Sequence, residues 1–223
     1  MVNTKAERLK QMTSLPQNDH PYGDRLPPGQ VLTERFPILH EGSVPEYNMT
    51  AWSFRVFGEV EEEKLFTFDE LMQLPKSKLV CDIHCVTRWS KFDTEWEGVR
   101  FKDLLAKLRI KPGAAHVMVH ADHDYQTNVP LEDLLRDDIM LATHYNGKPL
   151  TPKHGWPLRL IVPHLYFWKS AKWIRGLEFM AGDKPGFWES NGFHMYGDAS
   201  KEQRFSGEPL DIPEDEWVKK EFD

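Results

Sequence analysis

The sequence predicts an α+β fold with a mixed or largely antiparallel sheet and short helices. Hydrophobic residues make up 40% of the 223 residues and charged residues 28%, which is typical of a packed globular core. Strand-like and helical segments are mixed along the chain without a regular βαβ repeat. The chain contains no internal repeat and no low-complexity tract. One large domain with terminal extensions therefore accounts for the length.

Local patterns place the elements in order. Alternating or continuous apolar runs predict strands at residues 54–60, 78–85, 116–121, 140–145, 158–162 and 173–180. Helices are predicted at residues 67–74, 101–108 and 130–135, where Thr67 is the N-cap of the first and Pro130 stands in the first turn of the last. Asn146-Gly147 predicts a hairpin turn after the strand at 140–145.

The two ends of the chain differ from its middle. Residues 1–34 are polar and rich in proline, which predicts an extended N-terminal arm lying on the body. Residues 35–200 form the predicted domain. Residues 201–223 read as an acidic C-terminal tail, with Glu214, Asp215 and Glu216.

Charge and cysteine content restrict the function. Lys and Arg number 28 against 35 Asp and Glu, a net charge of −7, which argues against a nucleic-acid binder but permits a local basic pocket. Two cysteines make no disulfide framework, and the C-x3-C spacing is not the redox C-x-x-C pattern, so a reducing compartment fits. We find no apolar leader and no stretch long enough to span a bilayer. We therefore expect a soluble, cytoplasmic protein.

Cys85 ends one predicted strand and opens the turn-like stretch 86–91. Nearby Arg88 and Lys91 favour the thiolate form, which attacks electrophiles and binds soft metals. The plainer interpretation is a small buried hydrophobic residue. Two others are a zinc site that uses the histidines at 116, 120 and 123, although their spacing matches no common zinc pattern, and a Cys–His nucleophile pair.

A second unusual region lies at residues 153–173. Arg159 stands inside an apolar strand, where an unpaired charge is costly, so we expect it to meet an anion. Gly155 permits close backbone approach, and residues 168–173 add two lysines and a serine among aromatic residues. Such donors suit a phosphate group, whereas the alternative is a solvated basic edge strand. The chain has no G-x-G-x-x-G or P-loop motif.

Four short motifs follow one another along the chain. They are Arg-Phe-Pro-Ile-Leu-His at 35–40 with Val-Pro at 44–45, the strand that ends in Cys85, the Tyr125 segment at 124–131, and His-Gly-Trp-Pro-Leu-Arg at 154–159 with Ser-Ala-Lys-Trp at 170–173. Together with residues 145–150, they resemble the molybdopterin-binding domain of the sulfite oxidase family, which includes sulfoxide reductase catalytic subunits.

This resemblance implies a sulfite-oxidase-like molybdopterin-binding fold and a molybdenum–pterin cofactor. It implies that Cys85 is the single protein ligand of molybdenum, that Tyr125 lies beside the metal, and that Arg88 is catalytic. Soft sulfur ligands suit a metal that cycles between oxidation states while it gives or takes oxo groups. The cofactor-binding residues it implies are Arg35, His40, Cys85, Asp122, His154, Arg159, Ser170, Ala171 and Lys172.

The sequence also departs from the sulfite oxidases of this family. There, the cysteine is followed by a run with Asn and paired Arg that helps bind sulfite. Here Arg88 and Lys91 remain, with Trp89 between them, so small oxyanions and polar oxides are all candidate substrates. Roughly 40 residues follow the last predicted strand, fewer than the about 100 of an immunoglobulin-like dimerisation domain. There is also no room for a haem domain, so we expect an external electron-transfer partner.

The sequence thus predicts a molybdenum–pterin oxidoreductase that transfers an oxygen atom to or from a small oxyanion or an S- or N-oxide. We expect a small-molecule substrate and an external electron-transfer partner, without nucleic acid and without a membrane span. Two alternatives come from other classes. One is a non-catalytic molybdopterin-binding carrier protein, and the other is a metal-free cysteine hydrolase.

Overall fold

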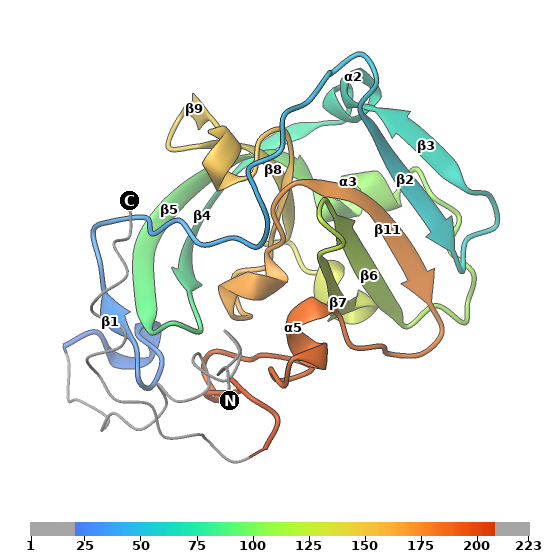
Figure 1. Ribbon diagram of the computed structural model, residues 1–223. Helices are drawn as coiled ribbons and strands as arrows, with labels where there is room; N and C mark the ends of the chain where they lie inside the picture. The colour runs from blue at the N-terminus through green and yellow to red at the C-terminus, as the bar shows by residue number, and fades with distance from the viewer. Residues whose placement is uncertain (1–20, 208–223) are drawn as a thin grey trace.

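The computed structural model describes residues 21–207, in which two β-sheets are joined by short helices (Figure 1). The first sheet contains β1 (Val31–Leu32), β4 (Lys76–His84), β5 (Trp89–Arg100), β8 (Met140–Tyr145), β9 (Lys148–Pro149) and β10 (Arg159–Ile161). The second contains β3 (Lys64–Thr67), β2 (Ser53–Gly58), β11 (Ile174–Met180), β6 (His116–Ala121) and β7 (Gln126–Pro130), in that order across the sheet. The helices are α2 (Phe68–Met72), α3 (Phe101–Leu105), α4 (Leu131–Leu134) and α5 (Phe187–Ser190), with 3₁₀ turns η1 (Gly23–Arg25), η2 (Pro152–His154) and η3 (Phe167–Lys169).

Strand pairing confirms the predicted α+β class with mixed sheets. The strand pairs are antiparallel except β1 with β5 and β2 with β11, which are parallel. The longest helices of the described residues, α2 and α3, have five residues each. Within residues 21–207 no helix is long and apolar enough to cross a membrane.

Most predicted elements are found near their expected places. All six predicted strands are present, and the Asn146-Gly147 hairpin joins β8 to β9 with both residues at positive φ. Thr67 caps α2 in a capping box, with its hydroxyl accepting from the Glu70 N–H and the Glu70 carboxylate accepting from the Thr67 N–H. The helix predicted at 101–108 ends at Leu105, and Pro130 is the N-cap of α4 rather than its first turn.

Five strands of the described residues, β1, β3, β5, β7 and β9, were not predicted. The stretch 86–91 was expected to be a turn, but the turn is complete at Arg88 and β5 begins at Trp89. Arg88 has a φ of 71°, and this left-handed residue reverses the chain within few residues. The short strand β7 was also missed, because its sequence Gln-Thr-Asn-Val-Pro is largely polar.

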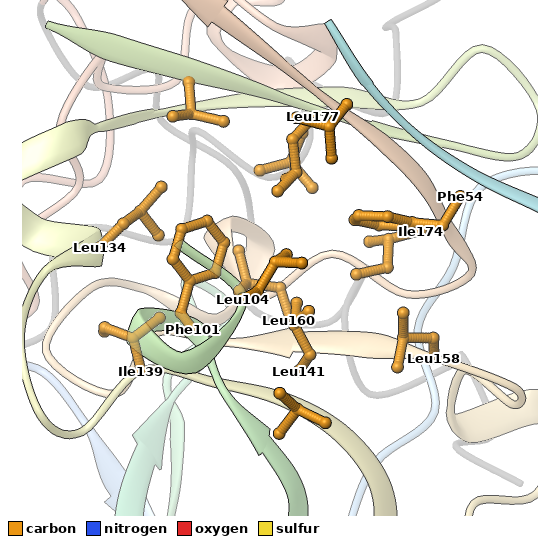
Figure 2. Close-up of a cluster of buried hydrophobic side chains, with 14 of the residues drawn as sticks. Phe54, Phe101, Leu104, Leu134, Ile139, Leu141, Leu158, Leu160, Ile174 and Leu177 are labelled. Atoms are coloured by element: carbon orange, nitrogen blue, oxygen red, sulfur yellow. The ribbon is translucent and has the colours of Figure 1, made fainter. Parts of the chain in front are cut away.

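The central strands β8 and β10 of the first sheet are buried on both faces, and the two apolar clusters that cover them position Cys85. Successive residues of β8 and β10 point to opposite faces, so that Leu141 and Leu160 enter one apolar cluster while Met140 and Ile161 enter another. The first cluster fills the space between the two sheets, where side chains from β2, β8, β10, β11 and α3 point toward one another (Figure 2). The second cluster contains Cys85 and lies on the opposite face.

Candidate functional site

Cys85 lies in the turn between β4 and β5. The Cys85 N–H donates to the Trp89 carbonyl at 2.8 Å, and the Arg88 N–H donates to the Cys85 carbonyl at 3.0 Å, so the thiol is held at one end of the hairpin. The residue is buried, and its Sγ lies 3.1 Å from the Thr87 hydroxyl. The hairpin therefore fixes a single cysteine among apolar residues at the edge of the second cluster.

The charge around Cys85 differs from the sequence expectation. Burial raises the pKa of the Cys85 thiol, whereas the Thr87 hydroxyl and the Arg204 guanidinium act against this rise. Arg88 and Lys91 were expected to favour the thiolate, and the Lys91 Nζ donates to the Glu34 carbonyl at 2.7 Å. The cation that acts on the thiol is Arg204, from the segment expected to be a tail.

Arg88 is buried with two of its nitrogens unsatisfied. Its Nη1 donates to the Gly29 carbonyl at 3.1 Å, while Nε and Nη2 have no hydrogen-bond partner among the described residues. Burial and the neighbouring Arg204 lower the pKa of Arg88. The charge of Glu202 acts against this fall, although Glu202 is not at ion-pair distance from Arg88. A buried guanidinium with free N–H groups and no ion-paired carboxylate is an anion-binding arrangement.

Tyr166 is a second unsatisfied donor in this region. It is fully buried, and its hydroxyl has no hydrogen-bond partner within residues 21–207. Burial raises the pKa of Tyr166, and the charges of Arg204, Arg88 and Cys85 also act on it. These groups therefore lie within electrostatic reach of one another, and the phenol stays protonated as a donor.

Tyr125 follows the β6–β7 turn, where His123 and Asp124 both have positive φ. Its hydroxyl donates to the Trp168 carbonyl at 2.6 Å. Burial raises the pKa of Tyr125 well above its ordinary value, and the charges of Glu189, Glu41 and, least of these, Cys85 add to the rise. Tyr125 therefore remains protonated and belongs to the same electrostatic environment as Cys85.

Arg159 and His154 form the centre of a cation-rich cradle. Arg159 is 2% exposed, and its Nη1 and Nη2 donate to the His154 and Ser170 carbonyls at 2.8 and 3.0 Å. Its Nε has no partner among the described residues. Burial lowers the pKa of Arg159 to about 9. The guanidinium packs against Phe167, 4.5 Å from the ring centre, and no carboxylate of the described chain pairs with it.

His154 has one occupied and one unsatisfied ring nitrogen. Its Nδ1 lies 2.8 Å from the Thr151 hydroxyl, and its buried Nε2 has no partner within the described residues. The ring stacks on Phe36 at 4.5 Å. Burial, followed by the charges of Arg159 and Lys172, lowers the pKa of His154 to about 4, so the imidazole is neutral.

Gly155 allows the backbone to pass close to the side chains of Lys172 and Arg159. Its φ is 108°, and a Cβ there would lie 3.0 Å from Cγ of Lys172 and 3.2 Å from Cβ of Arg159. Glycine therefore lets the backbone approach both cationic side chains closely.

The segment 170–172 lies beside Arg159. The Ser170 hydroxyl accepts from the Val162 N–H at 2.9 Å, and the buried Ala171 uses its carbonyl to accept from Leu160 at 2.9 Å. Lys172 donates from Nζ to the Lys153 carbonyl at 2.9 Å and lies 4.9 Å from the Trp173 ring centre. The structure thus brings these three residues to the cradle edge.

The three remaining predicted cofactor-binding residues lie in different parts of the structure. The Nδ1 of His40 is 3.0 Å from the Gly42 carbonyl, and its ring is 5.4 Å from that of Trp173. Asp122 accepts a short hydrogen bond from the Tyr47 hydroxyl. Arg35 is exposed, although it is next to Phe36, which stacks on His154.

The alternative zinc site is not supported. In residues 21–207 no group of three or more His, Cys, Asp or Glu side chains is arranged to hold a metal ion. His116 lies 3.8 Å from Asp183, and His120 lies 3.0 Å from Glu178.

The neighbours of Cys85 also differ from a Cys–His nucleophile pair. Its sulfur lies 3.1 Å from the Thr87 hydroxyl, and the adjacent His84 directs its Nδ1 to the Ser90 hydroxyl at 2.8 Å. A nucleophilic cysteine needs a base within hydrogen-bond reach.

Sequence reasoning missed Gln30, Tyr166 and Arg204. Tyr166 stands in the aromatic run Leu-Tyr-Phe-Trp, which reads as core. Gln30 and Arg204 lie in the predicted terminal segments and reach the Cys85 turn only through the fold. None of the three carries a local pattern that marks a site.

Comparisons with known proteins identify the family of this chain. The family described as oxidoreductase molybdopterin binding domain matches residues 41–188. The chain is 49% identical over 183 residues to the uncharacterized oxidoreductase YuiH of Bacillus subtilis, covering 82% of this chain and 92% of that protein. It is 24% identical to the mitochondrial sulfite oxidase of Drosophila melanogaster, over 80% of this chain.

A solved structure is also similar. The sulfane dehydrogenase SoxCD from Paracoccus pantotrophus matches with a TM-score of 0.58 and 25% identity over 64% of this chain. The present chain spans 37% of the sulfite oxidase and 41% of that SoxCD chain.

Proposed function

This chain belongs to the oxidoreductase molybdopterin binding domain family, and on that premise we propose that it transfers an oxygen atom to or from a small oxyanion or an S- or N-oxide. It is a molybdenum-dependent oxidoreductase of the sulfite oxidase family, and its cofactor is molybdenum bound to molybdopterin. The observation that carries the proposed reaction is that Arg88 and Arg159 are buried, keep N–H groups unsatisfied and have no carboxylate at ion-pair distance among residues 21–207.

The residues of the cradle fit the cofactor. A pterin phosphate is an anion with several acceptor oxygens, and Arg159 Nε and His154 Nε2 are buried polar atoms without a partner in the described chain. Gly155 keeps Lys172 and Arg159 close to the backbone. We assign cofactor binding to these residues with Ser170 and Ala171, and to His40, Asp122 and Arg35 at the margin.

Cys85 is the proposed protein ligand of molybdenum. When bound, the molybdenum cofactor supplies two-electron redox chemistry and oxygen-atom transfer. A thiol must lose its proton to bind a soft metal, and the Thr87 hydroxyl and Arg204 favour that loss against the effect of burial.

Tyr125 and Arg88 are the proposed hydrogen-bond donors to the oxygen atom that is transferred. Tyr125 is a protonated phenol whose single O–H donates to the Trp168 carbonyl in this structure, and in the proposed role it turns that donor to a metal oxo group or a substrate oxygen. Arg88 offers its unsatisfied Nε and Nη2 to the substrate oxyanion or oxide. The neighbouring Tyr166 hydroxyl adds a neutral donor, so the site favours small molecules that carry polar oxygen atoms.

The electrons come from, or go to, an external partner. A molybdenum site that works repeatedly must exchange electrons with a carrier. We propose a separate electron-transfer protein for this role.

The molybdenum content and the turnover of wild type, Cys85→Ser and Cys81→Ser test the ligand assignment. From a host that makes the cofactor, wild type should carry about one molybdenum per chain, and Cys85→Ser should lose turnover while it stays folded. Cys81→Ser is the matched control. The Cys81 sulfur is 3.7 Å from the Thr94 hydroxyl, and burial raises the pKa of Cys81 to about 12. It should therefore keep both metal and activity.

Screening sulfite, sulfoxides and N-oxides then identifies the substrate class. Turnover retained in Cys85→Ser would contradict the ligand assignment. Bound molybdenum without turnover on any of these compounds would favour a carrier protein, and no molybdenum at all would favour a cysteine hydrolase.

A further inference from the structure

Two terminal segments of the described chain meet at the Cys85 turn. β1 pairs in parallel with the first residues of β5, and it lies beside the β4–β5 end of the first sheet (Figure 1). Residues 202–204 approach the same turn from the C-terminal side, through hydrogen bonds to Val86 and Pro28. Both segments lie outside residues 41–188, the part that matches the family.

Gln30 bonds to both ends of the turn. Its side-chain amide nitrogen donates to the Cys85 carbonyl at 3.0 Å and to the Trp89 carbonyl at 3.1 Å. The residue is 6% exposed, so these bonds are made away from water. One buried amide thus joins the residue that carries the thiol to the residue that starts β5.

Arg204 holds the middle of the turn and Gln30 itself. Its Nη1 donates to the Val86 carbonyl at 2.7 Å, and its Nη2 donates to the Pro28 carbonyl at 3.1 Å and to Gln30 Oε1 at 3.2 Å. Its Nε donates to the Glu202 carboxylate at 3.3 Å, so the guanidinium is paired and 2% exposed. Arg204 therefore links the two terminal segments to the turn in one network.

The turn needs this support because it makes few bonds of its own. The backbone bonds between its two ends are those from the Cys85 and Arg88 N–H groups. Gln30 and Arg204 add three buried bonds to the carbonyls of Cys85, Val86 and Trp89. Buried bonds from fixed donors restrict the rotation of these peptide groups, and hence the direction of the Cys85 side chain.

We propose that Gln30 and Arg204 are positioning residues that aim the Cys85 sulfur at the metal. This inference rests on the proposed role of Cys85 as the molybdenum ligand. The shared domain at 41–188 supplies the ligand, and the two flanking segments fix its orientation. The groups that hydrogen-bond around a metal ligand fix its orientation toward the metal. Gln30 and Arg204 therefore act through Cys85 and not by contact with the substrate.

Two variants and a matched control test the proposal in the molybdenum-loaded protein. Gln30→Leu keeps the side-chain size without its hydrogen bonds, and Arg204→Gln shortens the donor. The control is Arg100→Gln, because Arg100 also donates to two backbone carbonyls, of Asp137 at 2.6 Å and Lys78 at 2.7 Å, but stands at the far end of β5.

Two readouts go beyond activity. Amide hydrogen exchange at Cys85 and Arg88 should be at least about 10-fold faster in Gln30→Leu and Arg204→Gln, because the loss of a single buried hydrogen bond already accounts for about 10-fold. The g-values of the Mo(V) electron paramagnetic resonance signal should shift in the same two variants. Both readouts should be unchanged in Arg100→Gln.

The outcomes separate this proposal from the ligand assignment. Wild-type exchange and g-values in folded Gln30→Leu overturn the positioning role, even if Arg204→Gln does not fold. A Mo(V) signal that is the same in Cys85→Ser and wild type overturns the ligand assignment, and the positioning role with it. Faster exchange and shifted g-values in Gln30→Leu, with the control unchanged, support the proposal.

Discussion

Replacing Arg159 with methionine should leave the cofactor-free protein about as stable as wild type, or more stable, while cofactor retention falls. Arg159 is 2% exposed and has no carboxylate partner among residues 21–207. Methionine keeps the apolar packing of the stem against Phe167 and Trp96 and removes the charge. The variant therefore distinguishes an arginine that stabilises the fold from one whose charge is balanced by a bound anion.

The size of the effect follows from the burial of the charge. Burial lowers the pKa of Arg159 from 12.5 to about 9, and each pKa unit corresponds to about 1.4 kcal/mol, so the charged form is destabilised by roughly 5 kcal/mol. In the variant the His154 and Ser170 carbonyls lose their donor, at about 1–3 kcal/mol each. The free energy of unfolding should thus change by between a loss of about 1 and a gain of about 3 kcal/mol.

Urea unfolding of protein from a host that lacks the pterin measures this change. Arg100→Met is the control, since Arg100 also donates to two carbonyls but is only partly buried, so it should bring a small loss and no gain. From a competent host, Arg159→Met should retain at least about 10-fold less molybdenum and pterin per chain, the loss of one charge-assisted bond. A loss of more than about 3 kcal/mol without the cofactor, or unchanged retention, would refute this reasoning.

Two further predictions concern His154 and Gly29. Because burial lowers the pKa of His154 to about 4, the folded cofactor-free protein leaves it neutral at pH values where the unfolded chain, with a pKa of 6.5, takes up a proton. Wild type should therefore lose stability as the pH falls from about 7 to about 5, and His154→Gln should lose less, as urea midpoints at the two pH values will show; equal losses would speak against a buried neutral imidazole. Gly29 and Gly23 both have positive φ, of 66° and 52°, but a Cβ at Gly29 would lie 2.7 Å from Arg88 Nη1 and from Glu202 Oε1, and a Cβ at Gly23 would meet nothing within 4 Å. Gly29→Ala should thus lower both the melting temperature and the turnover, whereas Gly23→Ala should bring only the backbone cost of about 1 kcal/mol; equal effects of the two on turnover would contradict the packing of Gly29 against the site.

The sequence was sufficient wherever the deciding interactions are local. The capping box of Thr67 and Glu70 spans four residues, and the hairpin at Asn146-Gly147 spans two, so both are legible in the sequence and both are found. Strands with a buried face, such as β6 and β8, were also found at their predicted bounds. The family resemblance supplied the cofactor class, which the match at residues 41–188 confirms.

The rest depends on contacts between distant residues. Arg204 donates to Val86 across 118 positions, and Gln30 donates to Cys85 across 55. Which carbonyl a buried glutamine or arginine bonds to is set by the packing of two sheets and two terminal segments, and no periodicity records it. The same holds for Lys91, which lies near Cys85 in the sequence but bonds to Glu34 in the fold.

The buried cationic side chains that stabilise the fold are ion-paired with a carboxylate, whereas those proposed to bind ligands are not. The chain has an excess of acids, and its buried structural cation uses one, since Lys169 lies 2.6 Å from Glu189 with both side chains fully buried. Arg204, which holds the Cys85 turn, is likewise paired with Glu202. Arg88 and Arg159 are buried as well, yet no described carboxylate pairs with either, and each keeps N–H groups unsatisfied. Since a buried unpaired charge is strongly unfavourable, the missing negative charge at both positions is best supplied by ligands. For Arg159 the proposed ligand is the cofactor phosphate, and for Arg88 it is the proposed oxygen-bearing substrate.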